Sequence, residues 1–184
     1  MRLLATVSCV LMLLAAPAFG QAGNPAGMIL GTGPQQPNSP DRLFVRAAAI
    51  GGMAEVEFGE LAQEKAQDDA VREFGRRMVE DHGKANDRLI SIAKSAGIAV
   101  PDALDPEHQA MRDRLSSLDG AEFDLVYVSG QVADHQKAAQ LLEYEIGSGQ
   151  HVDLKSFASE ILPIVLQHLR AAQELQAEMT GKNS

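Results

Sequence analysis

The chain has 184 residues, of which 45% are hydrophobic and 22% charged, and its formal net charge is −9 at pH 7. This length suffices for one domain with a continuous core. The 25 acidic residues are spread along the sequence and the 16 basic ones form no patch, which excludes nucleic acid as a partner. Cations are the natural small ligands of such a chain, although the same charge also serves solubility.

The N-terminal region predicts export. An apolar run over residues 3–15 and a small-residue site at residues 18–20 indicate a secretory signal peptide over residues 1–20. Residues 21–40 contain four glycines and four prolines, as in a flexible linker. The only cysteine, Cys9, lies in the predicted signal peptide, so the mature chain has no disulfide and no thiolate ligand.

Beyond this region the apolar residues recur with a helical period and none alternate as in a strand. The domain, residues 41–180, is therefore expected to be an all-α antiparallel four-helix bundle with a short helix between its two hairpins. Ser39 and Asp153 are the expected caps of the first and last helices, and no later run is apolar enough to cross a membrane. The predicted helices cover about residues 41–67, 70–97, 105–118, 121–146 and 153–181.

Chemistry-bearing residues fall on the inward faces of these helices. His82 and His168 occupy core positions of the second and fourth long helices, and Glu55 lies beside the apolar face of the first. On the third long helix the pattern leaves alternatives open, because either Asp134 or His135 faces the core, or both flank it. Each long helix therefore offers one polar side chain to the bundle interior.

Two further expectations concern small residues and the remaining histidines. Ala47, Gly51 and Ala54 lie on the apolar face of the first helix and predict close approach of a neighbouring helix. His108 and His151 lie near helix starts and are expected to be exposed.

The interior inventory suggests a metal but not a di-iron centre. Ferritin-like di-iron proteins use Glu on two helices and Glu-x-x-His on the other two, and here Val79 and Val165 replace both glutamates of those motifs. One divalent ion (Zn, Fe, Mn or Cu) remains compatible with nitrogen and oxygen donors, and Met78 adds a thioether suited to Cu(I). The candidate metal ligands are Glu55, His82, Asp134, His135 and His168.

Four segments, residues 44–57, 78–86, 134–138 and 162–169, resemble the ferritin-like domain-of-unknown-function family DUF4142. The resemblance covers about residues 42–177. It implies an exported bacterial helical bundle, often labelled an outer membrane protein, and no established reaction. Because the domain reads as helical throughout, a periplasmic location or one peripheral to the outer membrane is expected rather than a barrel.

Two hypotheses of function follow. The first is a non-catalytic envelope or stress-associated bundle that binds an envelope protein or a second copy of itself. In that case the buried histidines hydrogen-bond to an acid such as Glu55 or Asp134, or to backbone groups. The alternative is a mononuclear metal-binding or redox protein, in which three or more donors converge on one point.

Overall fold

The computed structural model describes residues 36–181, and this part of the chain is helical with no strand. No helix in residues 36–181 is both long and apolar enough to span a membrane. The predicted signal peptide and most of the predicted linker lie outside the described residues. The five helices are α1 (Ser39–Lys65), α2 (Asp69–Ser95), α3 (Pro106–Ser116), α4 (Gly120–Ser148) and α5 (Val152–Gly181).

The helix starts follow capping chemistry, with two corrections to the sequence prediction. Asn38, rather than Ser39, caps α1: its side chain accepts from the Asp41 N–H at 2.9 Å, and Asp41 accepts from the Asn38 N–H at 2.6 Å. This reciprocal pair is a capping box, in which two free N–H groups are satisfied at once. Asp105 caps α3, whereas Asp153 lies inside the first turn of α5.

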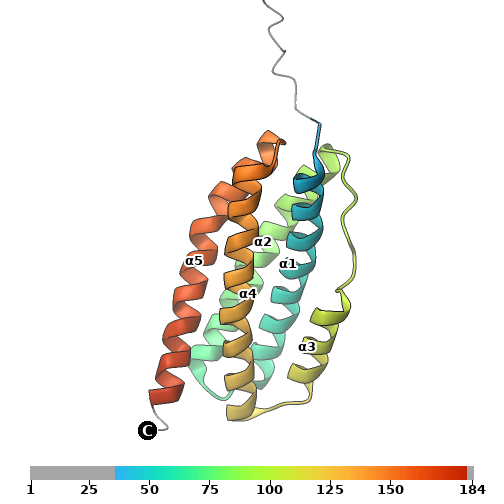
Figure 1. Cartoon of the computed structure of the whole chain (residues 1–184). Coiled ribbons are helices and arrows are strands. Elements are labelled where there is room, and N and C mark those ends of the chain that lie inside the picture. The colour runs from blue at the N-terminus through green and yellow to red at the C-terminus, as the bar shows by residue number, and fades with distance from the viewer. Residues whose placement is uncertain (1–35, 182–184) are drawn as a thin grey trace, which may run out of the picture. The chain divides into compact units, whose positions relative to one another are not determined.

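Four of the helices form an antiparallel bundle (Figure 1). The α1–α2 and α4–α5 hairpins pack side by side, with α1 against α4 and α2 against α5. The connection between the hairpins contains α3, which packs against α1 and α4. The predicted fold class, a four-helix bundle with a short additional helix between its hairpins, is confirmed.

The core of the bundle is divided into two apolar clusters. One contains Phe58, Phe74 and Tyr127, and the other contains Phe44 and Phe157. On each of α2, α4 and α5, a few mostly polar residues lie between the residues that belong to one cluster and those that belong to the other. Together they form a polar layer across the bundle. The polar residues of this layer, together with the adjoining position on α1, are Glu55, His82, Gln131, His135 and His168.

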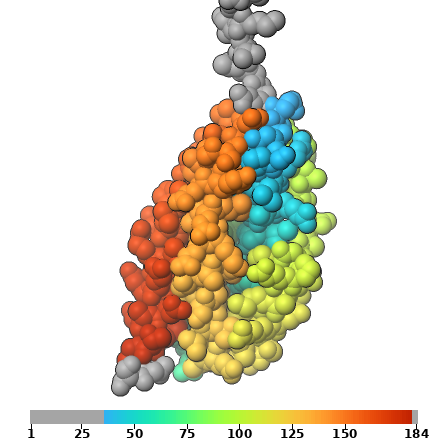
Figure 2. Space-filling model, viewed as in Figure 1, coloured from blue at the N-terminus to red at the C-terminus, as the bar shows by residue number. Residues whose placement is uncertain are grey.

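Close helix contact occurs at a different place from the one expected. A Cβ atom on Gly59 would lie 2.7 Å from the Gly75 carbonyl oxygen, so these glycines allow α1 and α2 to approach each other. The expectation of close approach at Gly51 is wrong, because a Cβ there would meet no atom within 4 Å. Gly51 instead lines a cavity, and Figure 2 shows the surface hollowed between α1, α3 and α4.

Candidate metal centre

Three histidines from three helices meet in the polar layer. The ring centroids of His82 and His135 are 5.5 Å apart, those of His82 and His168 are 5.5 Å apart, and those of His135 and His168 are 5.4 Å apart. One nitrogen of each ring lies within 4.8 Å of a nitrogen of each of the others. The α1–α2 hairpin contributes one ligand candidate and the α4–α5 hairpin contributes two.

The protonation of His135 follows from its hydrogen bond. Its Nδ1 lies 3.0 Å from the backbone carbonyl oxygen of Gln131, one turn earlier on α4. Since a carbonyl oxygen only accepts, Nδ1 carries the proton and Nε2 carries a lone pair. The Nε2 atom is buried and has no hydrogen-bond partner among residues 36–181.

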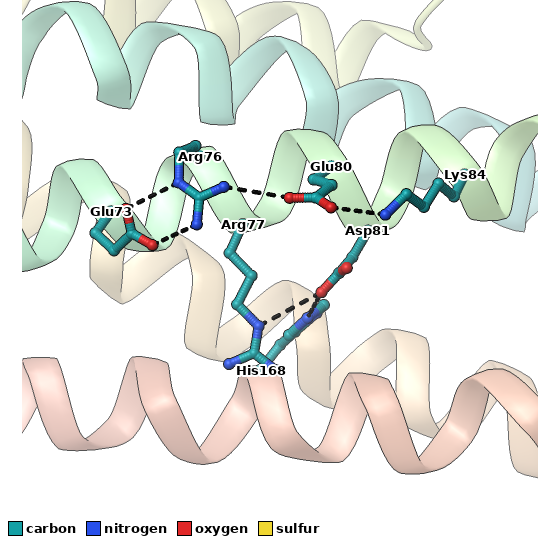
Figure 3. A network of polar contacts seen from close by, with 7 residues as sticks. All are labelled: Glu73, Arg76, Arg77, Glu80, Asp81, Lys84 and His168. Atoms are coloured by element: carbon teal, nitrogen blue, oxygen red, sulfur yellow. Dashed lines mark hydrogen bonds and ion pairs between the residues drawn. The ribbon is translucent and has the colours of Figure 1, made fainter.

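His168 is held in the same way by a carboxylate. Its Nε2 donates to Asp81 Oδ2 at 2.9 Å, and the same oxygen accepts from Arg77 Nε at 3.4 Å (Figure 3). The proton on Nε2 leaves the lone pair on Nδ1, which is buried and unpartnered in the described part of the chain. A carboxylate that orients the far nitrogen of a histidine is the usual support of a metal ligand.

Each of the three rings has one nitrogen without a partner. These nitrogens are His82 Nε2, His135 Nε2 and His168 Nδ1, each buried and free of hydrogen bonds to the described residues. Burying one such group without a partner costs about 1–3 kcal/mol. Three such rings that meet in one layer form an arrangement that a single cation would satisfy.

The electrostatics keep these rings neutral. Burial, the largest effect, lowers the pKa of His135 to about 4. Burial likewise lowers the pKa of His168 to about 4, although its hydrogen bond to Asp81 acts in the opposite direction. The pKa of His82 falls well below its ordinary value because of burial and then of its two histidine neighbours. All three are therefore uncharged at neutral pH, the state in which imidazole binds a metal.

Glu55 lies next to the histidines but outside the group of converging donors. It is 6% exposed, its Oε2 accepts from Gln131 Nε2 at 2.7 Å, and its Oε1 lies 3.7 Å from His135 Nδ1. Because Nδ1 carries the proton, Glu55 lies on the side of the His135 ring that cannot bind a metal. Burial raises the pKa of Glu55 to about 8, which keeps its carboxyl protonated at neutral pH.

The alternatives on α4 are resolved in favour of His135, which is 1% exposed. The side chain of Asp134 is 22% exposed and pairs with Lys137 at 3.4 Å, so it does not join the converging donors.

The acid that binds His168 is neither of the two that were expected, Glu55 and Asp134. The partner is Asp81, on α2, which the sequence reasoning missed together with Gln131. The position of Gln131, one helical turn before His135, is the signal that would have indicated its role.

The two remaining histidines are less exposed than expected. His151, in the α4–α5 turn, is 6% exposed because its backbone N–H is held by Asp41 at 3.1 Å. His108 is partly buried, with Nδ1 2.6 Å from Asp105 and its ring stacked on Phe58. Neither belongs to the group of three.

Comparison with known proteins identifies relatives of this fold. A family model described as a domain of unknown function, DUF4142, matches residues 30–175. The crystal structure of a DUF305 fragment from Deinococcus radiodurans is similar with a TM-score of 0.70 and 13% identity, over 78% of this chain and 99% of that one. The crystal structure of a DUF305 protein from Streptomyces coelicolor, described as secreted, has a TM-score of 0.64 and 16% identity, over 77% and 92% of the two chains. The curated proteins contain no match. At 13% and 16% identity, these similarities establish a shared fold and nothing more. The predicted ferritin-like fold class is confirmed.

Proposed function

The chain belongs to the DUF4142 family, a domain of unknown function, and we propose that this member binds one divalent metal ion through His82, His135 and His168. The observation that supports this function best is the meeting of three rings that each offer a nitrogen within 4.8 Å of the others and that each have one buried nitrogen without a partner. The ligand set is narrower than the five residues expected from the sequence, because Asp134 pairs outside the layer and Glu55 sits behind His135.

The chemistry of the donors limits the metal. Three neutral imidazoles suit Zn, Cu, Fe and Ni, and a hard ion such as Mg or Ca, which prefers oxygen, is disfavoured. No glutamate bridges a second position, since Val165 is buried on α5 where a di-iron protein has its acid. We therefore propose a mononuclear site, as the sequence also indicated, and we assign it no reaction.

The second function, a non-catalytic bundle without a metal, predicts that the buried histidine nitrogens are satisfied by acids or backbone groups. One nitrogen of His135 and one of His168 are satisfied in this way, by Gln131 and Asp81. The opposite nitrogen of each ring is not, which is why metal binding is preferred. A role in binding an envelope partner is compatible with either function.

We also propose that the protein is exported and works in the periplasm or at the periphery of the outer membrane. The support is the sequence of residues 1–20, with its apolar run and small-residue cleavage site. The check is cell fractionation with mass measurement of the mature protein. Detection of an uncleaved chain in the cytoplasm would contradict export.

The decisive test of metal binding uses untagged protein freed of metal with a chelator. Titration with Zn2+, Cu2+, Co2+, Fe2+ and Mn2+ by calorimetry should give one ion per chain for at least one of them. The double variant His82→Gln, His168→Gln should lose this binding while its circular dichroism stays helical. His108→Gln is the matched control, because it removes an imidazole outside the cluster, and it should bind as the native chain does. Absence of stoichiometric binding for all five ions, or unchanged binding in the double variant, would overturn the function.

A further inference from the structure

We propose that the cavity beside the histidine layer binds a small, elongated, uncharged molecule that is mostly apolar and carries one hydrogen-bonding group, which contacts Glu55. The cavity has a volume of about 350 Å³ and is walled by α1, α2, α4 and α5, with α3 at its mouth. This ligand is distinct from the metal of the proposed function, and we expect it to bind whether or not a metal is present.

The dimensions of the cavity define the size of the ligand. Its wall on α1 runs from Phe44 to Glu55, eleven positions apart, which is about 16 Å at a rise of 1.5 Å per residue. An apolar cavity of about 150 Å³ holds one benzene molecule. The observed volume of about 350 Å³ therefore accommodates a ligand of roughly twice the size of benzene, with its long dimension along the bundle axis.

The walls of the cavity specify an apolar ligand body. Most of the lining is apolar, and burial of a charged group against it would be costly. The uncharged polar part of the lining comes from His82, Asn86, His108 and His135. The charged residues Glu107, Asp134 and Lys137 line the cavity too, but Lys137 pairs with both acids, at 3.0 and 3.4 Å. The apolar part of the lining includes Phe44, Leu89, Leu141, Phe157, Ile161 and Val165.

The opposite end of the cavity is polar, because Glu55, His82 and His135 line it, and Glu55 is the group among these three that the proposed metal site does not use. Glu55 is 94% buried, being 6% exposed, and lines the cavity. Its Oε2 is satisfied by Gln131, but its Oε1 makes no hydrogen bond to the described residues. His135 Nδ1 lies 3.7 Å from Oε1 and already donates to a backbone carbonyl. A ligand hydroxyl or carbonyl group that reaches Oε1 would complete the bonding of this carboxyl group.

The space is kept open by the residues that surround it. Protein cores are packed as densely as organic crystals, so a cavity that reaches inward from the surface needs small residues along its walls. A Cβ atom at Gly51 would meet no atom within 4 Å, and the neighbouring wall positions Ala47, Ala48, Ala85 and Ala138 are small. Larger residues at these positions would fill part of the cavity.

The test is calorimetric titration of untagged, metal-free protein with the straight-chain alcohols from butanol to decanol, which serve as probes. Each is uncharged, elongated and ends in one hydroxyl group. We expect one molecule per chain and an affinity that increases about fourfold per added CH₂ group, until the chain exceeds the length of the cavity. No saturable binding of any of these alcohols would overturn the proposal.

Two variants locate the binding. Gly51→Leu fills the cavity and should lower the affinity for octanol at least tenfold. Gly147→Leu, at an exposed α4 glycine that also has open space around it, is the matched control and should leave the affinity unchanged. Equal octanol affinity in the two variants would overturn the site. Glu55→Leu should weaken octanol binding relative to octane binding, whereas an equal effect on both ligands would refute the polar anchor.

Metal titration of the same proteins keeps this inference separate from the proposed function. Gly51→Leu should bind metal as the native chain does, because Gly51 lines the cavity and is not one of the three histidines. Metal binding without alcohol binding would refute the cavity ligand alone. Alcohol binding without metal binding would refute the metal site alone.

Discussion

The strongest prediction concerns how metal affinity depends on pH. Protons compete with a metal for the same imidazole lone pairs, so the affinity of a histidine site ordinarily falls as the pH is lowered through about 6.5. In this bundle burial lowers the pKa of His135 and of His168 to about 4, and lowers that of His82 well below its ordinary value. Proton competition should therefore begin only near pH 4.

The magnitude is large enough to measure. At pH 5.0 a histidine with a pKa of about 6.5 is about 97% protonated, which weakens metal binding about 30-fold per ligand and roughly 1,000-fold for two. With the pKa of His135 and His168 at about 4, each remains mostly neutral at pH 5.0. The apparent dissociation constant should then rise by less than about fivefold between pH 7.5 and pH 5.0.

The assay is competition against a chromophoric chelator, with Zn²⁺ or Co²⁺, at half-unit steps from pH 7.5 to pH 4.0. Folding must be followed in parallel by circular dichroism. A histidine with a depressed folded-state pKa contributes stability above about pH 6.5, and this contribution is lost as the pH falls through about 4. A loss of affinity of 100-fold or more by pH 5.0, in protein that is still folded, would show that the histidines titrate normally and refute the reasoning.

Three further predictions concern the surroundings of the site and the stability of the bundle. Asp81→Asn removes the charged acceptor of a ligand histidine and should weaken metal binding about 10–100-fold, measured by the same competition assay, with little change in helicity. Glu145 is fully buried and burial raises its pKa to about 8, so its contribution to stability is complete below about pH 4.5 and is lost as the pH rises to about 8. Glu145→Gln should therefore gain stability relative to the native chain between pH 5 and pH 9, by about 1 kcal/mol or more in urea unfolding, and a constant difference would contradict the shift. Gly59→Ala should destabilise the bundle by about 1–3 kcal/mol because its Cβ would lie 2.7 Å from the Gly75 carbonyl oxygen, whereas Gly83→Ala, with open space around it, should be neutral or stabilising in the same unfolding measurement.

The fold could be predicted because its signals are local. Helical periodicity, an aspartate before Pro106 and glycine near helix ends each act over a few residues, and the helix bounds agree to within about two or three positions. The errors are also local. Asn38 and Ser39 are both good caps, and the choice between them depends on the side-chain geometry with Asp41, which the sequence does not specify.

The site could be predicted only in part because it depends on contacts between helices. His82 and His168 were identifiable from their places on apolar faces, but neighbouring residues on one helix point about 100° apart, so Asp134 and His135 could not be distinguished by pattern. Packing decides this, since only His135 is buried. The bond between His168 and Asp81 joins residues 87 positions apart, and no local signal indicates it.

The cavity illustrates a deeper ambiguity in the sequence. Small residues on the inner face of a helix permit either a close neighbour or an open space, and the sequence pattern is identical for both. Gly59 illustrates the first outcome, against Gly75, and Gly51 the second. Which one occurs depends on the side chains of the facing helices, and these become known only when the register of the bundle is fixed.

The same register explains why the proposed metal site consists of histidines alone. A di-iron centre needs acids to balance the charge of two ions, and such acids must be partnered when the metal is absent. Here the only acid within the layer, Glu55, is held by Gln131 behind a histidine, and its raised pKa of about 8 removes its charge at neutral pH. A neutral ligand set of this kind can stay buried without its metal at a moderate cost. One ion bound by His82 on the first hairpin and by His135 and His168 on the second would connect the two halves of the bundle, so metal binding and hairpin packing should stabilise each other.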